Sequence, residues 1–511
     1  MKYTAINIGP IIKTLGMARK PRELWAASYM FSYLMKCIVE ALPKATIISP
    51  SIFTKDEKNG IGLYPDRLFL KDSEVAYDTI LKPVVSKFAG DLKVDADYFN
   101  VMVVSGDYEK DSEAIKDLNY KLDCMELFNM ATDRITEDKV RELIGMKYGS
   151  KLFEDALGTK DFPIETLGEI AAIELCQEEG LKQFVKDIKS DDNKVSEKAY
   201  NNLPKDKLKS YHKYICVVQA DGDNVGKTVS HSQLPDGKVK EISTSLLEFG
   251  NSAKKTIKDF GGLPIYAGGD DLLFIAPVVG KDLSNIFQLL NKLNDESFDC
   301  VKKVVAGCGL KYPDDYDKPE GHRMPEDKKT PIKASLSFGV SITYYKYPLY
   351  EALESARNLL FDKAKKVDGK NAVVVDWRKH SGGAFTVQFS KSKEDLQNAF
   401  TQMIEASSKS VDESVVSAVA HKIRENEGLL SLWMGDGNIE QRNNNFFQKY
   451  LEYNPNKEED KKSASDKYKD AAFSLLNELF KTETDISILT QTMYGMLRMA
   501  KFIKGEEVKD E

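Results

Sequence analysis

Two apolar runs near the middle of the chain are separated by a short segment of glycine and aspartate. Residues 263–267 and 272–277 are apolar and rich in side chains that favour strands. Between them stand Gly268, Gly269, Asp270 and Asp271. This pattern predicts a β-hairpin whose tight turn carries two carboxylates at an exposed tip. The two glycines accept positive φ angles and leave room for a ligand to approach the backbone.

A second acidic segment follows an apolar run upstream. Residues 214–220 are mostly apolar and are followed by Asp221-Gly-Asp-Asn-Val-Gly-Lys227. Side chains two residues apart in a strand share a face, so we expect Asp221 and Asp223 to point the same way, with a glycine between them. A helical pattern over 242–260 separates the two acidic segments. The chain therefore predicts a strand–helix–hairpin unit that brings three or four carboxylates together.

These carboxylates have the chemistry of a site for hard divalent cations, which take oxygen ligands. The candidate ligands are Asp221, Gly222, Asp223, Asp270 and Asp271. Asp221 and Asp270 would bridge two Mg²⁺ or Mn²⁺ ions, helped by the Gly222 carbonyl, in a site for phosphoryl transfer. The backbone amides of residues 224–226 would cradle a phosphate. Either acidic segment alone is more typical of a solvated turn, and only their combination favours a metal site.

The pattern downstream extends this unit to a ferredoxin-like order of elements. A polar insertion over 309–330, which we expect to be a loop, precedes a strand-like run over 332–343. A helical pattern over 349–367 and a short apolar run over 371–376 follow. The resulting order β–α–β–β–α–β, with a further strand, is typical of ferredoxin-like domains, and we assign it to residues 209–383.

The flanking regions carry no second acidic hairpin. Residues 1–110 alternate short apolar runs with a helical pattern, which predicts a smaller α/β domain. Residues 111–208 are helical and polar-faced, and Thr166 with Glu169 has the spacing of a helix capping box. Residues 384–511 are helical by periodicity. A chain of 511 residues is long enough for these four domains.

Composition limits the classes of function. The chain is 42% hydrophobic and 30% charged with a net charge of −7, which argues against a nucleic-acid binder that relies on a broad basic surface. No apolar run is long enough for a membrane span, and no signal peptide is recognisable. The six cysteines lack CxxC spacing. We therefore expect a cytoplasmic protein with reduced thiols, no membrane contact and no zinc site.

Several short motifs follow one another in a fixed order over most of the chain. They are Ile8-Gly-Pro10, residues 18–29, Phe162-Pro-Ile-Glu-Thr166, residues 220–227, Gly268-Gly-Asp-Asp271, Ser337-Phe-Gly339, residues 347–353, Ala364-Lys365 and Ser381-Gly-Gly383. In this order they resemble the large, palm-containing subunit of type III CRISPR interference complexes, and within it the III-B branch. No single motif decides the resemblance, which depends on their order.

The resemblance implies an α+β fold of two ferredoxin-like palm domains, similar to nucleotidyl cyclases, plus two helical domains. In that arrangement the first palm is degenerate and the second, with its GGDD hairpin, is catalytic. The implied activity is a nucleotidyltransferase that target RNA activates to make an adenylate second messenger, a cyclic oligoadenylate, from ATP with release of pyrophosphate. The implied partners are guide crRNA, target RNA and the other subunits of the complex.

The resemblance also assigns roles in nucleotide binding. The expected nucleotide-binding residues are Asn224, Gly226, Gly268, Gly269, Ser337, Lys365 and Lys370. The two lysines would neutralise phosphate charge, and the serine would hydrogen-bond the nucleotide. A solvated helix end is an equally good interpretation of the lysines, and a plain polar strand residue of the serine. None of the five histidines is followed by aspartate, so the His-Asp pair of the family's HD nuclease is missing and we expect no DNA cleavage.

Three alternatives remain open from the sequence. In the first alternative, the palm joins AMP to an acceptor other than ATP, such as S-adenosylmethionine. In the second, the chain is a scaffold subunit with a silent palm, which holds guide RNA and partner proteins without turnover. A free-standing diguanylate-type cyclase fits less well, because the Gly-Gly-Asp-Asp segment, the opening motif and the tail differ from that family.

Overall fold

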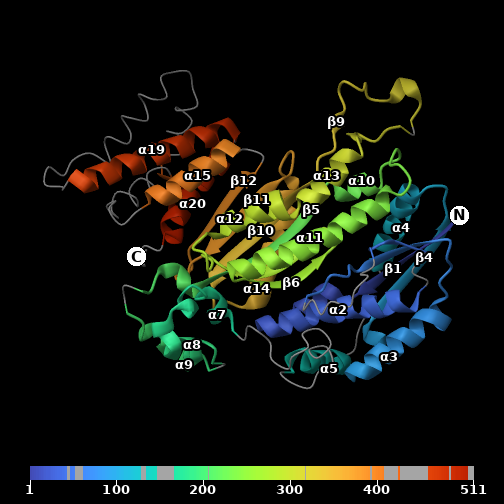
Figure 1. Cartoon of the computed structure of the whole chain (residues 1–511), viewed down its shortest axis with the longest axis horizontal. Helices are drawn as coiled ribbons and strands as arrows, with labels where there is room; N and C mark the ends of the chain where they lie inside the picture. Colours follow the sequence, from blue (N-terminus) through green and yellow to red (C-terminus); the bar gives the residue numbers. More distant parts are fainter. Residues whose placement is uncertain are drawn as a thin grey trace.

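The computed structural model describes residues 1–42, 46–51, 61–127, 134–146, 166–190, 192–204, 207–316, 318–391, 394–407, 424–425, 459–482 and 485–504. Two large β-sheets lie in the body of the protein, and helices cover them (Figure 1). The α+β class expected from the sequence is confirmed. The beginning of the proline motif, residues 162–165, lies outside the described part of the chain.

The first sheet is formed by the N-terminal part of the chain and, with the helices packed on it, makes up the first unit; the second sheet and its helices make up the second unit. The strand order of the first sheet is β2-β3-β1-β4, and all its neighbouring strands are antiparallel. The strands are β1 (Lys2–Gly9), β2 (Ile47–Ser49), β3 (Arg67–Lys71) and β4 (Asn100–Asp107). Apolar side chains alternate along β1, so Ile6 and Ile8 join one hydrophobic core while Tyr3 and Ala5 join another. The first sheet is therefore covered on both faces.

Helices from two parts of the chain cover these faces. Helices α2 (Pro21–Ala41) and α3 (Lys82–Leu92) share the core of Ile6, and α4 (Asp111–Glu126) shares the core of Tyr3. Two shorter helices, α1 (Ile11–Leu15) and α5 (Arg134–Gly145), flank α2. The sequence placed α4 in a helical linker domain, but Ile115 and Leu118 are buried against the first sheet. Because the outer face of α4 is polar, the sequence pattern did not predict this packing.

The second sheet has six strands in the order β12-β11-β10-β5-β7-β6. They are β5 (Tyr214–Asp223), β6 (Leu263–Gly268), β7 (Asp271–Pro277), β10 (Ser335–Tyr344), β11 (Ala372–Arg378) and β12 (Ala384–Ser390). Only β10 and β11 are parallel. The order β–α–β–β–α–β is present in β5, α11 (Lys238–Phe260), β6, β7, a helical segment at residues 286–307 and β10. That second helical segment was not predicted from the sequence, and α14 (Leu349–Asn358) with β11 follows the unit instead of belonging to it. Strand β12 was not expected, because residues 384–511 were assigned to a helical domain.

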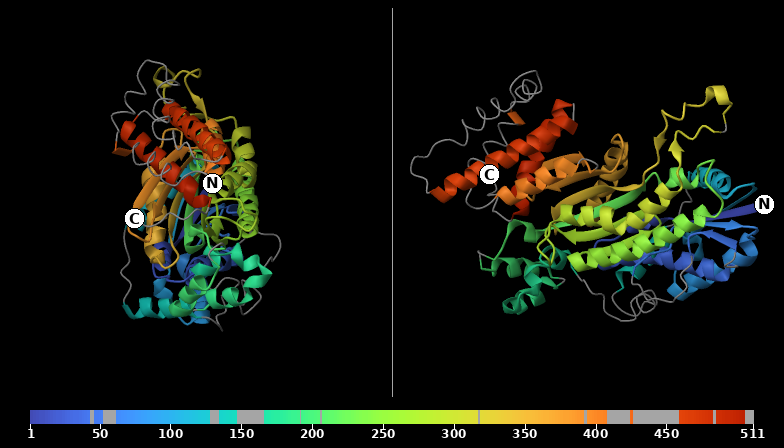
Figure 2. Two further views of the ribbon diagram at one scale, coloured as in Figure 1. Left: turned by 90° about the vertical axis from the view of Figure 1, so that its left-hand side faces the viewer. Right: turned by 45° about the horizontal axis from the view of Figure 1, so that its top comes forward.

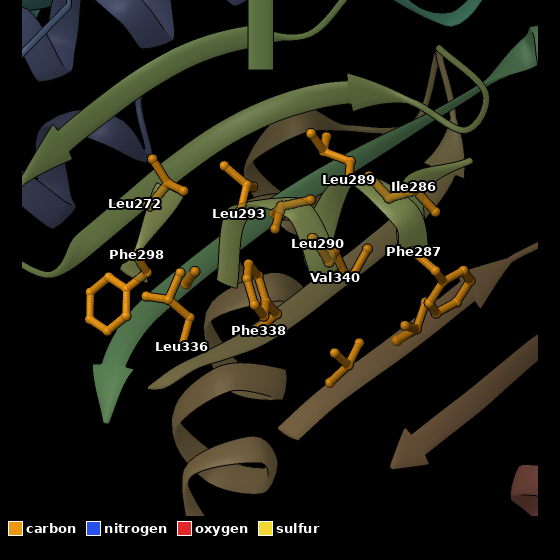
Figure 3. Close-up of a cluster of buried hydrophobic side chains, with 14 of the residues drawn as sticks. Leu272, Ile286, Phe287, Leu289, Leu290, Leu293, Phe298, Leu336, Phe338 and Val340 are labelled. Carbon is orange, nitrogen blue, oxygen red and sulfur yellow. The ribbon is translucent and has the colours of Figure 1, made fainter. Parts of the chain in front are cut away.

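Two hydrophobic layers hold the second sheet between helices. On one face lie α11, α12 (Ile286–Lys292) and α13 (Asp299–Gly307). Figure 3 shows Leu289, Leu290 and Leu293 lying over Phe338 and Val340 of β10. On the other face, α14 and the short α7 (Leu167–Ala171) share a core with α2 of the first unit. The helix α7 begins as expected, because the Thr166 side chain accepts a hydrogen bond from the Glu169 amide.

The first unit is attached to the edge of the second sheet. The Ala267 amide donates to the Gly62 carbonyl at 2.9 Å, and Gly62 forms a β-bridge with Tyr266 of β6. The Ser28 hydroxyl of α2 also donates to the Ile265 carbonyl at 3.4 Å. Figure 1 shows α2 lying beside β6. These contacts set the two units on either side of a shared cavity.

The remaining elements extend from the second sheet. The helices α8 (Lys182–Ile188) and α9 (Asn193–Asn201) precede β5, and α15 (Glu394–Ala406), α19 (Glu459–Thr482) and α20 (Ile486–Ile503) follow β12. The insertion after α13 is not a plain loop, because β8 (Lys311–Tyr312) pairs with β9 (Thr330–Pro331) at its base. Figure 2 shows this insertion projecting from the body. None of the described helices is long and apolar enough to cross a membrane.

Candidate active site

The two acidic segments meet on neighbouring strands. Strands β5 and β7 are antiparallel, and their last register pair is Ala220 with Leu272. Continuing this register by one residue sets Asp221 opposite Asp271. Directly opposed side chains lie on the same face of a sheet, with Cβ atoms roughly 5 Å apart. These two carboxylates therefore face one another across adjacent strands.

The turn between β6 and β7 brings the third carboxylate to Gly222. Gly268 pairs with Asp271, so Gly269 and Asp270 form a two-residue turn, and the φ of +65° at Gly269 suits a glycine. A Cβ atom on Gly222 would lie only 2.6 Å from the Cβ of Asp270. The missing side chain of Gly222 therefore allows the turn to close over β5.

The hairpin tip is more enclosed than the sequence predicted. Asp270 and Asp271 are half-buried rather than exposed, because the first unit packs along this edge of the second sheet. Burial, followed by the charge of Asp221, raises the pKa of Asp270 to about 7. Burial and the same neighbour also raise the pKa of Asp271, and burial raises that of Asp221. The acidic cluster of Asp221, Asp270 and Asp271 therefore lacks the nearby positive charge that would keep all three carboxylates ionised.

Asp223 has different surroundings from those of the other three aspartates. It is fully buried, and its carboxylate accepts hydrogen bonds from Ser335 at 2.6 Å and from Ser337 at 2.8 and 3.0 Å. The Asn371 amide and the Lys365 ammonium add bonds of 2.9 and 2.8 Å. Asp221 and Asp223 do point the same way, as expected, since both contact Lys365. However, these donors occupy both oxygens of Asp223, so its carboxylate holds Lys365 and the neighbouring donors instead of being open to a metal ion.

The expected contact between Ser337 and a nucleotide also needs correction. Ser337 is fully buried in β10, directly opposite Asp221 in the register, and its hydroxyl donates to Asp223. It also accepts a hydrogen bond from the Ala372 amide at 3.3 Å. Ser337 therefore fixes Asp223 and cannot reach a ligand in the cavity. The sequence identified an important serine but assigned it the wrong partner.

Lys365 lies among the acidic segments. It belongs to a short 3₁₀ turn, Ala364–Lys366, that follows α14. Its ammonium donates to the carbonyls of Asp221 and Gly222, at 2.9 Å each, and forms an ion pair with the Asp221 carboxylate. Burial alone would lower the pKa of Lys365, but the charges of Asp221 and Asp223 outweigh it, so the pKa is raised. The lysine is therefore part of the site, and the interpretation as a solvated helix end is wrong for it.

Lys370 stands beside this lysine in an unusual backbone conformation. Gly369, Lys370 and Asn371 have φ angles of 75°, 54° and 48°, a left-handed run that is rare for residues with side chains. The run directs the Asn371 amide to Asp223. Burial, followed by repulsion from Lys365, lowers the pKa of Lys370. Such strain is maintained at functional sites, where the surrounding contacts impose it.

The loop after β5 contains the remaining candidates. Asn224 adopts a left-handed conformation with a φ of 64° and donates from its side chain to the Lys333 carbonyl at 2.9 Å. Gly226 follows in the short helix α10 (Val225–Val229). A Cβ atom on Gly226 would meet nothing within 4 Å, so open space lies beside this position.

The site opens into a cavity of about 1060 Å³ between the two units. The first unit contributes Asn7, Asp66 and Glu126 to its wall, and the second contributes Gln219, Tyr266 and Asp271. Asp66 was not predicted as a site residue, because a single aspartate in a Tyr-Pro-Asp-Arg segment matches no recognisable motif. Burial raises the pKa of Asp66 against the opposing charge of Arg67, and the charge of Glu126 raises it further. Asp66 also contributes to the raised pKa of Asp271.

The oxygen donors of the site fit a divalent cation, although the described side chains alone do not form a complete ion-binding cluster. Among the described residues, no three His, Cys, Asp or Glu side chains stand close enough together to hold a metal ion jointly. Nevertheless, two backbone carbonyls and the Asp221 carboxylate already converge on one cation, the Lys365 ammonium. Oxygen donors of this kind are those that Mg²⁺ and Mn²⁺ prefer.

The charges of the cluster give a first testable prediction. Asp270 holds its proton more tightly in the folded chain than in the unfolded chain, so stability is lost progressively as the pH rises from about 4, the ordinary pKa of aspartate, to about 7. Asp270→Asn should therefore stabilise the metal-free protein by roughly 2–4 kcal/mol at pH 8 and by much less at pH 4. Thermal unfolding in EDTA at both values measures this. Asp236→Asn, in an exposed turn, is the matched control, and an equal gain at both pH values would contradict the assignment.

Two parts of the chain match models of known protein families. Residues 214–374 match the family model described as Cas10/Cmr2, second palm domain, and residues 3–70 match the model described as CRISPR-associated protein Cmr2, N-terminal. The chain is 29% identical over 234 residues to the CRISPR system Cmr subunit Cmr2 of Pyrococcus furiosus. That alignment covers 41% of this chain and 24% of the relative, so the chain matches about a quarter of the relative's length.

Solved structures share the fold over nearly the whole chain. Type III-B Cmr-beta in the apo state superposes with a TM-score of 0.53 and 10% identity, covering 97% of this chain and 81% of that one. Type III-B Cmr-beta bound to cognate target RNA gives a TM-score of 0.55 and 11% identity, covering 97% and 82%. At these identities the likeness concerns the fold alone.

Proposed function

From the homology of this chain to the Cas10/Cmr2 proteins, we propose that it is the large subunit of a type III-B CRISPR complex and transfers AMP from ATP in a metal-dependent reaction. One observation carries the proposal: Asp221 and Asp271 face one another on adjacent strands, and Asp270 closes over Gly222. Paired carboxylates in this arrangement suit nucleotidyl transfer with two ions.

Each group of the site has a role in this reaction. Asp221, Asp270, Asp271 and the Gly222 carbonyl would hold the ions, which would activate the acceptor hydroxyl and neutralise the leaving pyrophosphate. The hydroxyl oxygen forms a bond to the α-phosphorus as the bond to the β-phosphate oxygen breaks. Lys365 and Lys370 would neutralise phosphate charge, and Asp223, held by Ser335 and Ser337, would position Lys365.

The expected partners follow from the same relationship. They are the other subunits of the complex, guide crRNA and target RNA, with binding of target RNA as the signal that starts turnover. The net charge of −7 fits a subunit that meets RNA through local contacts and through its partners rather than through a broad basic surface. The product of the usual kind would be a cyclic oligoadenylate.

A second acceptor class is favoured by the charge of the cavity. Besides the proposed metal ligand Asp271, four acidic side chains line it, against two cationic ones: Asp66, Asp97, Glu126 and Glu354 against Lys13 and Arg357. Lys13 also pairs with Glu137 at 2.5 Å, so its charge is already partly used. A second triphosphate would meet repulsion from this wall, whereas a positively charged acceptor would be attracted. S-adenosylmethionine, with its sulfonium and ammonium groups, has that character.

Mass spectrometry of the products tests the proposal. The assembled complex would receive target RNA, Mn²⁺ and labelled ATP, with and without S-adenosylmethionine. Oligoadenylates from ATP alone would support the usual product, and a product that needs the second compound would support the positively charged acceptor. Absence of any product and of pyrophosphate release would refute the proposed activity and favour a silent scaffold.

A further inference from the structure

A cation of the protein already occupies part of the proposed metal site. The Lys365 ammonium is held by the Asp221 and Gly222 carbonyls, both at 2.9 Å, and by the Asp221 carboxylate. Its side chain is only 12% exposed, so solvent screens these contacts weakly. Of the oxygens around this ammonium, the Asp221 carboxylate and the Gly222 carbonyl are the ones assigned above to a divalent ion.

An ammonium and a divalent ion cannot use these oxygens at the same time. Two cations a few ångströms apart in a partly buried site repel one another strongly. The lysine has a second anchor, however, because Asp223 accepts from it at 2.8 Å. Asp223 is itself fixed by Ser335, Ser337 and the Asn371 amide. Its carboxylate therefore keeps its place whichever cation the neighbouring oxygens hold.

We propose that Lys365 is the resident counter-ion of the metal-free site, and that a divalent cation binds as this ammonium withdraws from Asp221 and Gly222 while staying paired with Asp223. The inference rests on the proposed location of the metal site. It makes the lysine a competitor of the ion when no nucleotide is bound. Once a triphosphate is present, its negative charge stabilises both cations, and the competition disappears.

Binding of Mn²⁺ to the full chain without nucleotide tests this competition. The free ion is measured by electron paramagnetic resonance for the wild type, Lys365→Met and Lys365→Gln. Both variants should bind Mn²⁺ about tenfold more tightly than the wild type, because the competing charge is gone. Lys366→Met is the matched control, since Lys366 is mostly exposed, pairs with Asp362 and should leave the affinity unchanged.

Two further measurements show whether the change in Mn²⁺ affinity comes from this site. Adding Asp221→Asn to Lys365→Met should remove the tight binding, which assigns it to this site. With a non-hydrolysable ATP analogue present, the advantage of Lys365→Met should vanish or reverse, which a purely structural role of the lysine would not produce. Lys365→Gln retains a hydrogen-bond donor for Asp223 and so guards against a variant that fails to fold.

The two proposals fail in different ways. Unchanged or weaker Mn²⁺ binding in folded Lys365→Met and Lys365→Gln would overturn the inference, even if the complex makes a product from ATP. Tighter binding in both variants, without any product from the wild-type complex, would support the inference and refute the proposed activity.

Discussion

Replacing Asp270 and Asp271 together by alanine should abolish product formation, with a loss of about a thousandfold or more. The two carboxylates would supply most of the ion-binding oxygens of the site, and the ions contribute several kcal/mol of charge stabilisation to the transition state. Each 1.4 kcal/mol corresponds to a tenfold change in rate. The measurement is the rate of pyrophosphate release by the assembled complex with target RNA and ATP.

The same double variant should remain folded. Asp270 and Asp271 are half-buried at a turn, and burial followed by the charge of Asp221 raises the pKa of both, so their ionised forms are unfavourable when no ion is present. Their removal should leave the unfolding temperature unchanged or raise it. Asp236→Ala, in an exposed turn of the same unit, serves as the control with normal activity. Product formation at the wild-type rate by the double variant would sink the assignment of the site.

Gly339→Ala should lower the free energy of unfolding by about 3 kcal/mol or more, the upper end for overpacking of a core. Gly339 lies in β10, where α14 and the turn after it cross the sheet. A Cβ atom there would clash with the Ala356 carbonyl oxygen and lie 2.5 Å from the Leu360 amide nitrogen. These are backbone atoms, so no rotamer change relieves the contact. Chemical denaturation measures the effect.

A second glycine provides the control for this prediction. Gly90 lies within α3, and a Cβ atom on it would meet nothing within 4 Å. Gly90→Ala should therefore stabilise the protein slightly, by up to about 1 kcal/mol. If Gly339→Ala unfolded at the same denaturant concentration as the wild type, the close packing of α14 on β10 would be incorrect.

The sequence predicted the elements whose signal is local. The apolar runs of β5, β6, β7 and β10, the glycine turn of the hairpin and the periodicity of α11 were all sufficient for a correct assignment. The pairing of Asp221 with Asp223 on one face followed from the period of a strand. Strand β12 was missed, although Phe385, Val387 and Phe389 alternate as in a strand.

The contacts within the site could not be predicted in the same way, because they join distant parts of the chain. Ser337 is 114 residues from Asp223, and Lys365 is 142 residues from it. The register between β5 and β10 decides that the serine meets this carboxylate, and no local pattern contains that register. Asp66 lies in the other unit and reaches the cavity only because Gly62 is bound to the edge strand.

Strand β12 has a practical consequence for dissecting the protein. Residues 384–390 complete the second sheet beside β11, and α20 packs on this end, with Phe502 stacked on Trp377 at 4.3 Å between ring centroids. A fragment ending at residue 383 would leave the β11 backbone unpaired along one side and uncover Trp377. Exposed strand edges of this kind recruit other chains and promote aggregation. A fragment meant to carry the catalytic unit alone should therefore retain both β12 and α20.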